Sequence, residues 1–148
     1  MPVIVVGADS KIGRAIVQHL AERPGEVRVF VSSPEAATTL RSRGVKIAVG
    51  DLSDDSHVGA AATGAYCAVL VTEAAYDGRS FAFGAPDDVV EGWLRAVRGA
   101  GVTRIIVVGT PRIPVSVATS EMRVLATDDM TTEAITHAVA ALDEARRL

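Results

Sequence analysis

Hydrophobic residues along the chain fall into short, nearly continuous runs that alternate with longer segments of helical spacing. The runs cover residues 3–6, 27–31, 46–49, 68–71 and 104–108, with a further candidate near 122–125. They are rich in β-branched side chains and contain few polar residues, which is typical of strands covered by helices on both faces. This alternation predicts an α/β fold: a doubly wound parallel sheet of five or six strands, Rossmann-like, in a single domain over residues 1–148.

The intervening segments repeat apolar residues every three or four positions and therefore predict helices. The expected buried faces contain Ile12, Ile16 and Leu20 in the first helix, Val90, Trp93, Leu94 and Val97 in a later one, and Ile135, Val139 and Leu142 in the last. Two shorter helices are expected, one opened by Pro34 and one between residues 53 and 62. Trp93 shares its face with valines, which favours a core position for this side chain.

The segment between the fourth strand and the following helix has a different pattern. Residues 73–85 contain glycines and aromatic residues without a regular period, which predicts a loop over the carboxyl edge of the sheet. Asp88 and Glu91 have the spacing of a capping box at the start of the next helix.

The junction between the first strand and the first helix contains the clearest candidate site. Its residues are Gly7, Ala8, Asp9, Ser10, Lys11, Ile12 and Gly13. Glycine at the start allows a backbone angle closed to other residues, and the N–H groups at the start of a helix attract a pyrophosphate. A glycine-rich turn in this position predicts a dinucleotide site that uses all seven residues. The alternative, a tight turn that needs glycine only for its own geometry, stays open.

Together with two other segments, this turn resembles the NmrA-like atypical short-chain dehydrogenases/reductases. The family's first turn is G-x-x-G-x-x-G, and Ser10 stands here in place of its middle glycine. Gly50-Asp51-Leu52 is similar to the family's G-D-L, and residues 101–108 are similar to the segment that leads into its fifth strand. The resemblance covers roughly residues 1–110. It implies NAD or NADP as the cofactor, with Asp51 and Leu52 at the adenine.

The choice between the two cofactors depends on the end of the second strand. The acidic residue that accepts the ribose 2′-OH in NAD-binding proteins is absent there, and Glu35 comes slightly too late. Ser32 and Ser33 are therefore expected at the adenosine ribose, and NADP is mildly favoured. Relatives that prefer NADP place a basic residue in or near the glycine turn, and Lys11 and Arg14 are the nearest candidates.

Three alternatives qualify these assignments. Ser32, Ser33 and Asp51 also fit ordinary capping of the helices that follow them. Asp9 places a negative charge beside the expected pyrophosphate and would weaken binding unless it turned outward to cap the helix. If Asp9 and Ser10 abolish dinucleotide binding, the fold serves another ligand or none.

Whether the chain is an enzyme is left open by its sequence. Reductases of the short-chain class use a Tyr-x-x-x-Lys pair for proton transfer, but Tyr66 and Tyr76 are followed four residues later by leucine and serine. Many NmrA-like relatives lack this pair and act as dinucleotide sensors, so a non-catalytic regulator or assembly partner is the alternative to an oxidoreductase. In an oxidoreductase, the nicotinamide would lie near Thr72 and Thr110, with a small-molecule substrate beneath the loop and Glu73 and Tyr76 on the same edge.

Composition narrows the expected partners and location. A net charge of −3 without a basic stripe argues against nucleic acid, and apolar runs of strand length argue against membrane insertion. A single cysteine, Cys67, forms no intrachain disulfide, which favours a reducing cytoplasm. The three histidines lack metal-ligand spacing. Only about 40 residues follow the fifth strand, so apolar surface left by a small substrate region is expected to be covered in a homo-oligomer such as a dimer.

Overall fold

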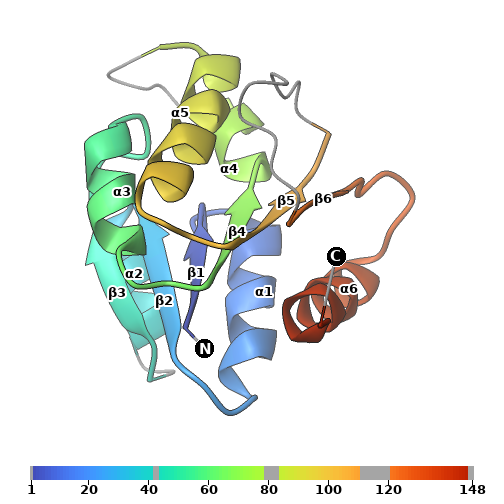
Figure 1. Cartoon of the computed structure of the whole chain (residues 1–148). Coiled ribbons are helices and arrows are strands. Elements are labelled where there is room, and N and C mark those ends of the chain that lie inside the picture. Colours follow the sequence, from blue (N-terminus) through green and yellow to red (C-terminus); the bar gives the residue numbers. More distant parts are fainter. Residues whose placement is uncertain (1, 42–43, 79–83, 111–120, 147–148) are drawn as a thin grey trace.

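The computed structural model describes residues 2–41, 44–78, 84–110 and 121–146, and within these ranges six parallel strands form one sheet. The strands are β1 (Val3–Val6), β2 (Val27–Val31), β3 (Lys46–Val49), β4 (Cys67–Val71), β5 (Arg104–Val108) and β6 (Met122–Leu125). The helices are α1 (Lys11–Ala21), α2 (Pro34–Arg41), α3 (Asp55–Ala62), α4 (Glu73–Tyr76), α5 (Pro86–Gly99) and α6 (Thr132–Glu144). The predicted fold class, and the sixth strand with it, is confirmed (Figure 1).

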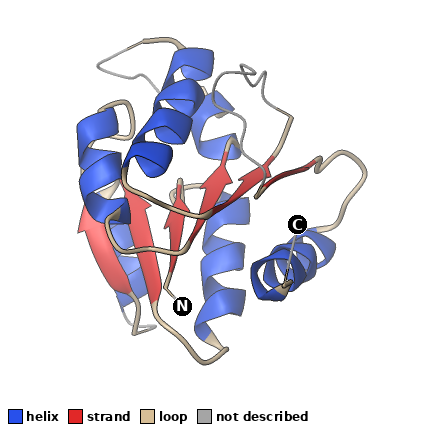
Figure 2. Cartoon of the chain, in the orientation of Figure 1, coloured by secondary structure: helices blue, strands red, loops and turns tan. Residues whose placement is uncertain are grey.

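Helices cover both faces of the sheet, as the continuous apolar strands require (Figure 2). Successive residues of a strand point to opposite faces. Val3 and Val5 therefore join the core formed with α1, α2 and α6, whereas Ile4 and Val6 join the core formed with α3, α4 and α5.

The strand order is β3-β2-β1-β4-β5-β6, so the order reverses between β1 and β4. Val6 at the end of β1 is paired in register with Phe30 of β2 and Leu70 of β4. The carboxyl ends of these three strands consequently lie side by side. In open α/β sheets, ligands bind at this edge, where the strand order reverses.

Two local predictions differ from the structure. The segment expected to be a loop begins with the short helix α4; residues 79–83 of that segment lie outside the described residues. Asp88 is not the first residue of a capping box but its last: the N-cap of α5 is Ala85, the helix starts at Pro86, and the Asp88 carboxylate accepts a hydrogen bond from the backbone N–H of Ala85 at 3.1 Å. Proline is favoured in the first turn of a helix because the N–H that it lacks would have no partner there. The helix α5 therefore starts upstream of the position predicted from Asp88.

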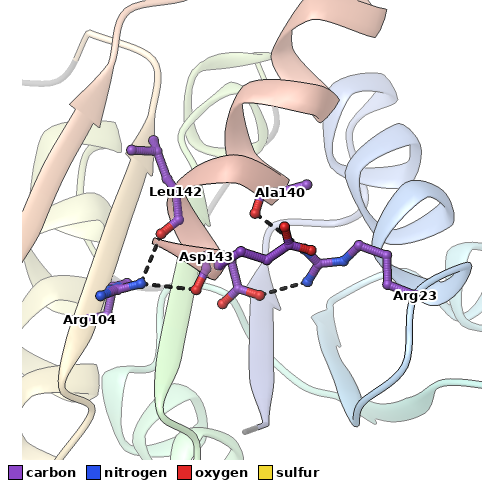
Figure 3. A network of polar contacts seen from close by, with 6 residues as sticks. Arg23, Arg104, Ala140, Leu142 and Asp143 are labelled. Carbon is purple, nitrogen blue, oxygen red and sulfur yellow. Dashed lines mark hydrogen bonds and ion pairs between the residues drawn. The ribbon is translucent and has the colours of Figure 1, made fainter. Parts of the chain in front are cut away.

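A buried arginine holds α6 against the amino edge of the sheet (Figure 3). Arg104, at the start of β5, is 1% exposed, and its Nη1 donates to the carbonyls of Leu142 and Asp143, both at 2.9 Å. Its Nε donates to a Glu121 carboxylate oxygen at 3.0 Å. Arg23 pairs with the Asp143 side chain at 2.7 Å. Carbonyls in the last turn of a helix lack intrahelical partners, so Arg104 caps α6.

Cys67 lies beside this network and is fully buried. Burial, and next the nearby Asp143 carboxylate, raise the pKa of its thiol far above the ordinary value, so the group stays protonated and a poor nucleophile. We expect the native protein to react negligibly with a thiol-specific disulfide reagent at mildly alkaline pH. The denatured chain should react with one equivalent, measured by absorbance of the released thiolate. Rapid reaction of the native protein would show that the Cys67 thiol is not buried as described.

Within the described ranges, every helix is too short or too polar to cross a bilayer.

Candidate functional site

The glycine-bounded turn lies where β1 ends and α1 begins, and both terminal glycines are required by close backbone contacts. Gly7 has φ of 90°, and a Cβ there would lie 2.7 Å from the carbonyl oxygen of Val71. A Cβ on Gly13 would lie 2.4 Å from the carbonyl oxygen of Gly7 and 2.7 Å from the Cα of Ala8. The turn is therefore tight, and α1 packs directly against the end of β1.

Ser10, which replaces the middle glycine of the motif, is the N-cap of α1. Its Oγ accepts from the N–H of Gly13 at 3.0 Å and donates to the carbonyl of Gly7 at 3.2 Å. The side chain is 5% exposed. Its hydroxyl thus closes the turn from inside.

The N-terminus of α1 already binds an anion, supplied by the chain itself. Glu73, the first residue of α4, accepts a hydrogen bond from the N–H of Ile12 at 3.2 Å. A carboxylate here lies at the positive end of the helix dipole. The backbone N–H therefore fits a group such as a pyrophosphate, although in this conformation a ligand would have to displace Glu73. Sequence reasoning placed Glu73 at this edge but missed the contact, because 61 positions separate the two residues.

The Asp9 side chain reaches the end of β2 and does not take the outward, helix-capping position that the sequence left open. It is 7% exposed, and its Oδ2 accepts from the Ser32 N–H at 3.0 Å, the Ser32 hydroxyl at 3.1 Å and the Ser33 N–H at 2.9 Å. Since Ser10 caps α1, Asp9 is not needed there. The carboxylate ties the glycine turn to the neighbouring β2–α2 junction.

Ser33 has the capping role that the sequence left open. Its Oγ accepts from the N–H of Ala36 at 3.2 Å, at the start of α2, and donates to the carboxylate of Glu35 at 2.8 Å. Hydrogen bonds from the backbone N–H of Glu35 itself, and next from the Ser33 hydroxyl, hold the pKa of the Glu35 carboxyl below its usual range. In this conformation the hydroxyls of Ser32 and Ser33 are both donated to acidic side chains of the chain itself.

Asp51 and Leu52, the two residues expected at the adenine, have different contacts in the structure. One Asp51 oxygen accepts from the N–H of Ser53 at 2.8 Å and from its hydroxyl at 2.6 Å, which shapes the turn before α3. Leu52 is fully buried, and its carbonyl accepts from the indole N–H of Trp93 at 2.6 Å. The Leu52 side chain therefore belongs to the core, and any contact of this residue with an adenine would be made by its backbone. The core position predicted for Trp93 is confirmed.

A pocket of about 290 Å³ opens beside the turn at the carboxyl edge. Its lining includes Ile12, Thr72, Glu73, Tyr76, Thr110 and Thr127. The expectation that Thr72, Glu73, Tyr76 and Thr110 lie together at this edge is thus confirmed. Thr127, which follows β6, was missed by sequence reasoning because nothing in the local pattern shows where the chain passes after that strand.

The floor of this pocket is closely packed. The Thr72 hydroxyl donates to the carbonyl of Val108 at 2.8 Å and joins the ends of β4 and β5. Gly109 has φ of 129°, and a Cβ there would collide with the Thr72 Oγ1 at 1.9 Å. Thr72 is 4% exposed and Thr110 is exposed, so Thr110 offers the more accessible hydroxyl.

The described residues contain no Tyr-x-x-x-Lys arrangement at this edge. Tyr66 precedes β4 at the opposite edge, where the Arg104 guanidinium lies 5.6 Å from its ring centroid. The Tyr76 hydroxyl is hydrogen-bonded to the carboxylate of Asp87. Lys46 pairs with Glu26 at 2.9 Å. The same described ranges hold no cluster of three or more metal-ligating side chains.

With this geometry in view, comparison with known proteins identifies the family. A family model described as NAD(P)H-binding matches residues 7–147. The chain belongs to the NAD(P)H-binding family. The resemblance stated from the sequence is confirmed, and the family supplies the cofactor type, NAD(P)H, without deciding between its two forms.

Solved structures of reductases resemble this NAD(P)H-binding domain in fold. Triphenylmethane reductase of Citrobacter sp., solved with NADP(H), is 23% identical with a TM-score of 0.61, covering 74% of this chain and 37% of its own. The anaerobillin reductase ChuY of Escherichia coli O157:H7 is 25% identical with a TM-score of 0.57, covering 74% and 51% respectively. The chain thus matches about a third to a half of the length of these reductases.

One solved structure matches over nearly its whole length. Serine dehydrogenase of Escherichia coli is 15% identical with a TM-score of 0.65, covering 99% of this chain and 92% of its own. At this identity the match shows the fold alone. A comparison with curated protein sequences finds no significant match.

Proposed function

We propose that this chain binds NAD(P)H at the carboxyl edge of the sheet, with the pyrophosphate at the N-terminus of α1. The observation that carries the proposal is the hydrogen bond from the Ile12 N–H to the Glu73 carboxylate, because it shows an anion bound by the helix terminus. A pyrophosphate takes the place of this carboxylate when the dinucleotide binds. Membership of the NAD(P)H-binding family supports the same assignment.

The remaining parts of the dinucleotide follow from this anchor. The turn Gly7–Gly13 surrounds the pyrophosphate, the β2–α2 junction with Ser32 and Ser33 adjoins the adenosine ribose, and Asp51 adjoins the adenine. The nicotinamide enters the pocket of about 290 Å³ beside Thr72 and Thr110, which also receives a small-molecule substrate.

Glu73→Gln tests the pyrophosphate position. Its neutral side chain removes the charge that competes with the pyrophosphate and keeps nearly the same shape. We expect the variant to bind NADH or NADPH about tenfold more tightly than the wild type, as measured by titration calorimetry. A tenfold change in affinity corresponds to about 1.4 kcal/mol, which is less than the repulsion of about 4 kcal/mol between two like charges about 4 Å apart near a protein surface.

Glu91→Gln is the matched control, because Glu91 lies on α5 and pairs with Arg95 on the same helix. It should bind both nucleotides as the wild type does. Equal affinities of the Glu73→Gln variant and the wild type would show that the pyrophosphate lies elsewhere. Absence of binding by all three proteins would refute the proposed function itself.

Two activities remain compatible with dinucleotide binding. The first is an NAD(P)-dependent oxidoreductase, in which the nicotinamide transfers hydride to a substrate in the pocket. The second is a non-catalytic sensor or assembly partner, favoured by the described positions of Tyr66 and Tyr76, which leave the edge without a tyrosine–lysine pair. A panel of carbonyl and quinone compounds separates them: NAD(P)H consumption with any compound supports the enzyme, and binding without turnover on the whole panel supports the sensor.

We also propose that the protein is cytoplasmic and self-associates, with no nucleic-acid or membrane partner. Val49 on the outer strand β3 is 50% exposed and Val124 on the outer strand β6 is 43% exposed, so each sheet edge presents apolar surface for a second copy. Sedimentation over a range of concentrations tests this, and a monomer at all concentrations would exclude the homo-oligomer.

A further inference from the structure

A groove between α1 and α6 shares no residue with the pocket at the carboxyl edge. The two helices pack side by side although they lie near opposite ends of the chain (Figure 1). The groove has a volume of about 310 Å³, and its described lining includes two histidines and two glutamates but no lysine or arginine. Its chemistry is therefore that of imidazoles and carboxylates, which the proposed dinucleotide site does not use.

The two imidazoles, from His19 on α1 and His137 on α6, are in contact. Their ring centroids lie 4.6 Å apart, and the ring planes are inclined by 49°. The His137 side chain is 63% exposed. His19 is partly exposed and makes no side-chain hydrogen bond to another described residue. Both rings line the groove, so a solute that enters it meets two imidazoles together.

The separation of the rings matches that of two histidines bound to one metal ion. An imidazole nitrogen binds a transition metal at about 2.0–2.1 Å, which places the centroids of two rings on the same ion about 5 Å apart. The observed 4.6 Å is close to this value. A metal ion therefore requires the rings to turn about their side-chain bonds, but it does not require the helices to move. Neutral imidazole is a good ligand for Zn²⁺, Ni²⁺ and Cu²⁺.

Carboxylates on both helices favour a cation in this groove. A Glu133 oxygen lies 3.9 Å from Nε2 of His137, and the Glu133 side chain is 86% exposed. Glu22 is exposed and follows His19 by three residues, which places the two on the same side of α1. Two negative charges beside two neutral imidazoles attract a divalent cation.

We infer that His19 and His137 form a binding site for one divalent transition metal ion, Zn²⁺, Ni²⁺ or Cu²⁺, which links α6 to α1. The described ranges hold no group of three ligating side chains, so water completes the coordination of the ion. The sequence did not indicate this site, because the two histidines belong to separate helices. The inference is independent of dinucleotide binding, since the two sites share no residue.

Titration calorimetry of the untagged protein, freed of metal with a chelator, tests the site. We expect one Zn²⁺ to bind per chain, and Cu²⁺ to bind more tightly than Zn²⁺ or Ni²⁺, which is the general order for nitrogen ligands. Saturating Zn²⁺ should raise the melting temperature by at least about 4 °C, because an ion that binds the folded arrangement stabilises it. Mg²⁺, which prefers oxygen ligands, should leave the melting temperature unchanged. Absence of Zn²⁺ binding would overturn the inference and leave the proposed function intact.

Substitutions test whether both histidines bind the same ion. His19→Gln and His137→Gln should each weaken Zn²⁺ binding by at least about tenfold, because each leaves a single imidazole. His57→Gln is the matched control: His57 on α3 also lies near a carboxylate, 3.5 Å from Asp54, but has no second imidazole in contact with it in the described structure. This control should bind Zn²⁺ as the wild type does.

Circular dichroism verifies the fold of each variant. His137 is mostly exposed, so His137→Gln decides the question even if His19→Gln is unstable. Wild-type affinity for Zn²⁺ in a folded His137→Gln or His19→Gln variant, or loss of binding in His57→Gln, would overturn the assignment of the ion to this pair.

Discussion

Replacing Gly13 by alanine is expected to lower the free energy of unfolding by about 3 kcal/mol, the upper end of the usual range for forcing a methyl group into a packed site. The added Cβ would lie 2.4 Å from the Gly7 carbonyl oxygen and 2.7 Å from the Ala8 Cα. Both obstacles are backbone atoms, so the contact is relieved only if α1 moves away from the turn. Urea denaturation followed by circular dichroism measures the change, and titration with NADH should show weaker binding by the displaced amides.

Gly99→Ala provides the matched control, because Gly99 also lies in a helix but its added Cβ meets nothing within 4 Å. Alanine there should leave nucleotide binding unchanged and raise stability by about 0.5 kcal/mol through its better helix propensity. If Gly13→Ala were as stable as Gly99→Ala, the tight packing of α1 on the turn would be disproved.

The second large effect is expected at the buried arginine of the amino edge. Arg104→Met should cost about 3 kcal/mol of stability, because it leaves the Glu121 carboxylate and the carbonyls of Leu142 and Asp143 without their donor. Methionine preserves much of the apolar volume of the arginine side chain, so the decrease in stability reports mainly the loss of the polar contacts. Thermal unfolding measures it, and hydrogen exchange should show faster opening of α6 than of α1.

Arg95→Met is the comparison, because the Arg95–Glu91 pair lies on the surface of α5 with side chains 53% and 37% exposed. Its loss should cost about 0.5 kcal/mol or less. Similar costs for the two arginines would mean that Arg104 contributes no more than a surface ion pair.

Most of the fold could be predicted because the information is local. Buried parallel strands require apolar runs, and these runs marked every strand of the described sheet within a residue at each end. The doubly wound architecture followed from the lack of alternation in the same runs. The start of α5 was misplaced because Pro86 and Asp88 offer competing signals, and α4 was missed because four residues are too few to show a helical period.

The site was predicted less well, because its decisive contacts join residues far apart in the sequence. Thr72 and Thr110 were placed at the carboxyl edge because they follow the ends of strands, and both line the pocket there. The partners of Asp9 and Glu73 lie 23, 24 and 61 positions away, and no periodicity records such pairs. The burial of the Leu52 side chain was not predicted, because a motif shows which residues are adjacent in sequence, not which of them faces the core.

Because the Glu73 carboxylate is hydrogen-bonded to the Ile12 N–H, a second anion cannot bind this N–H group at the N-terminus of α1 at the same time. In the proposed complex, a nucleotide that takes this N–H would release the Glu73 carboxylate at the start of α4, whose Tyr76 is hydrogen-bonded to Asp87 of α5. Glu73 is therefore the side chain whose contacts would differ most between the free protein and the proposed nucleotide complex.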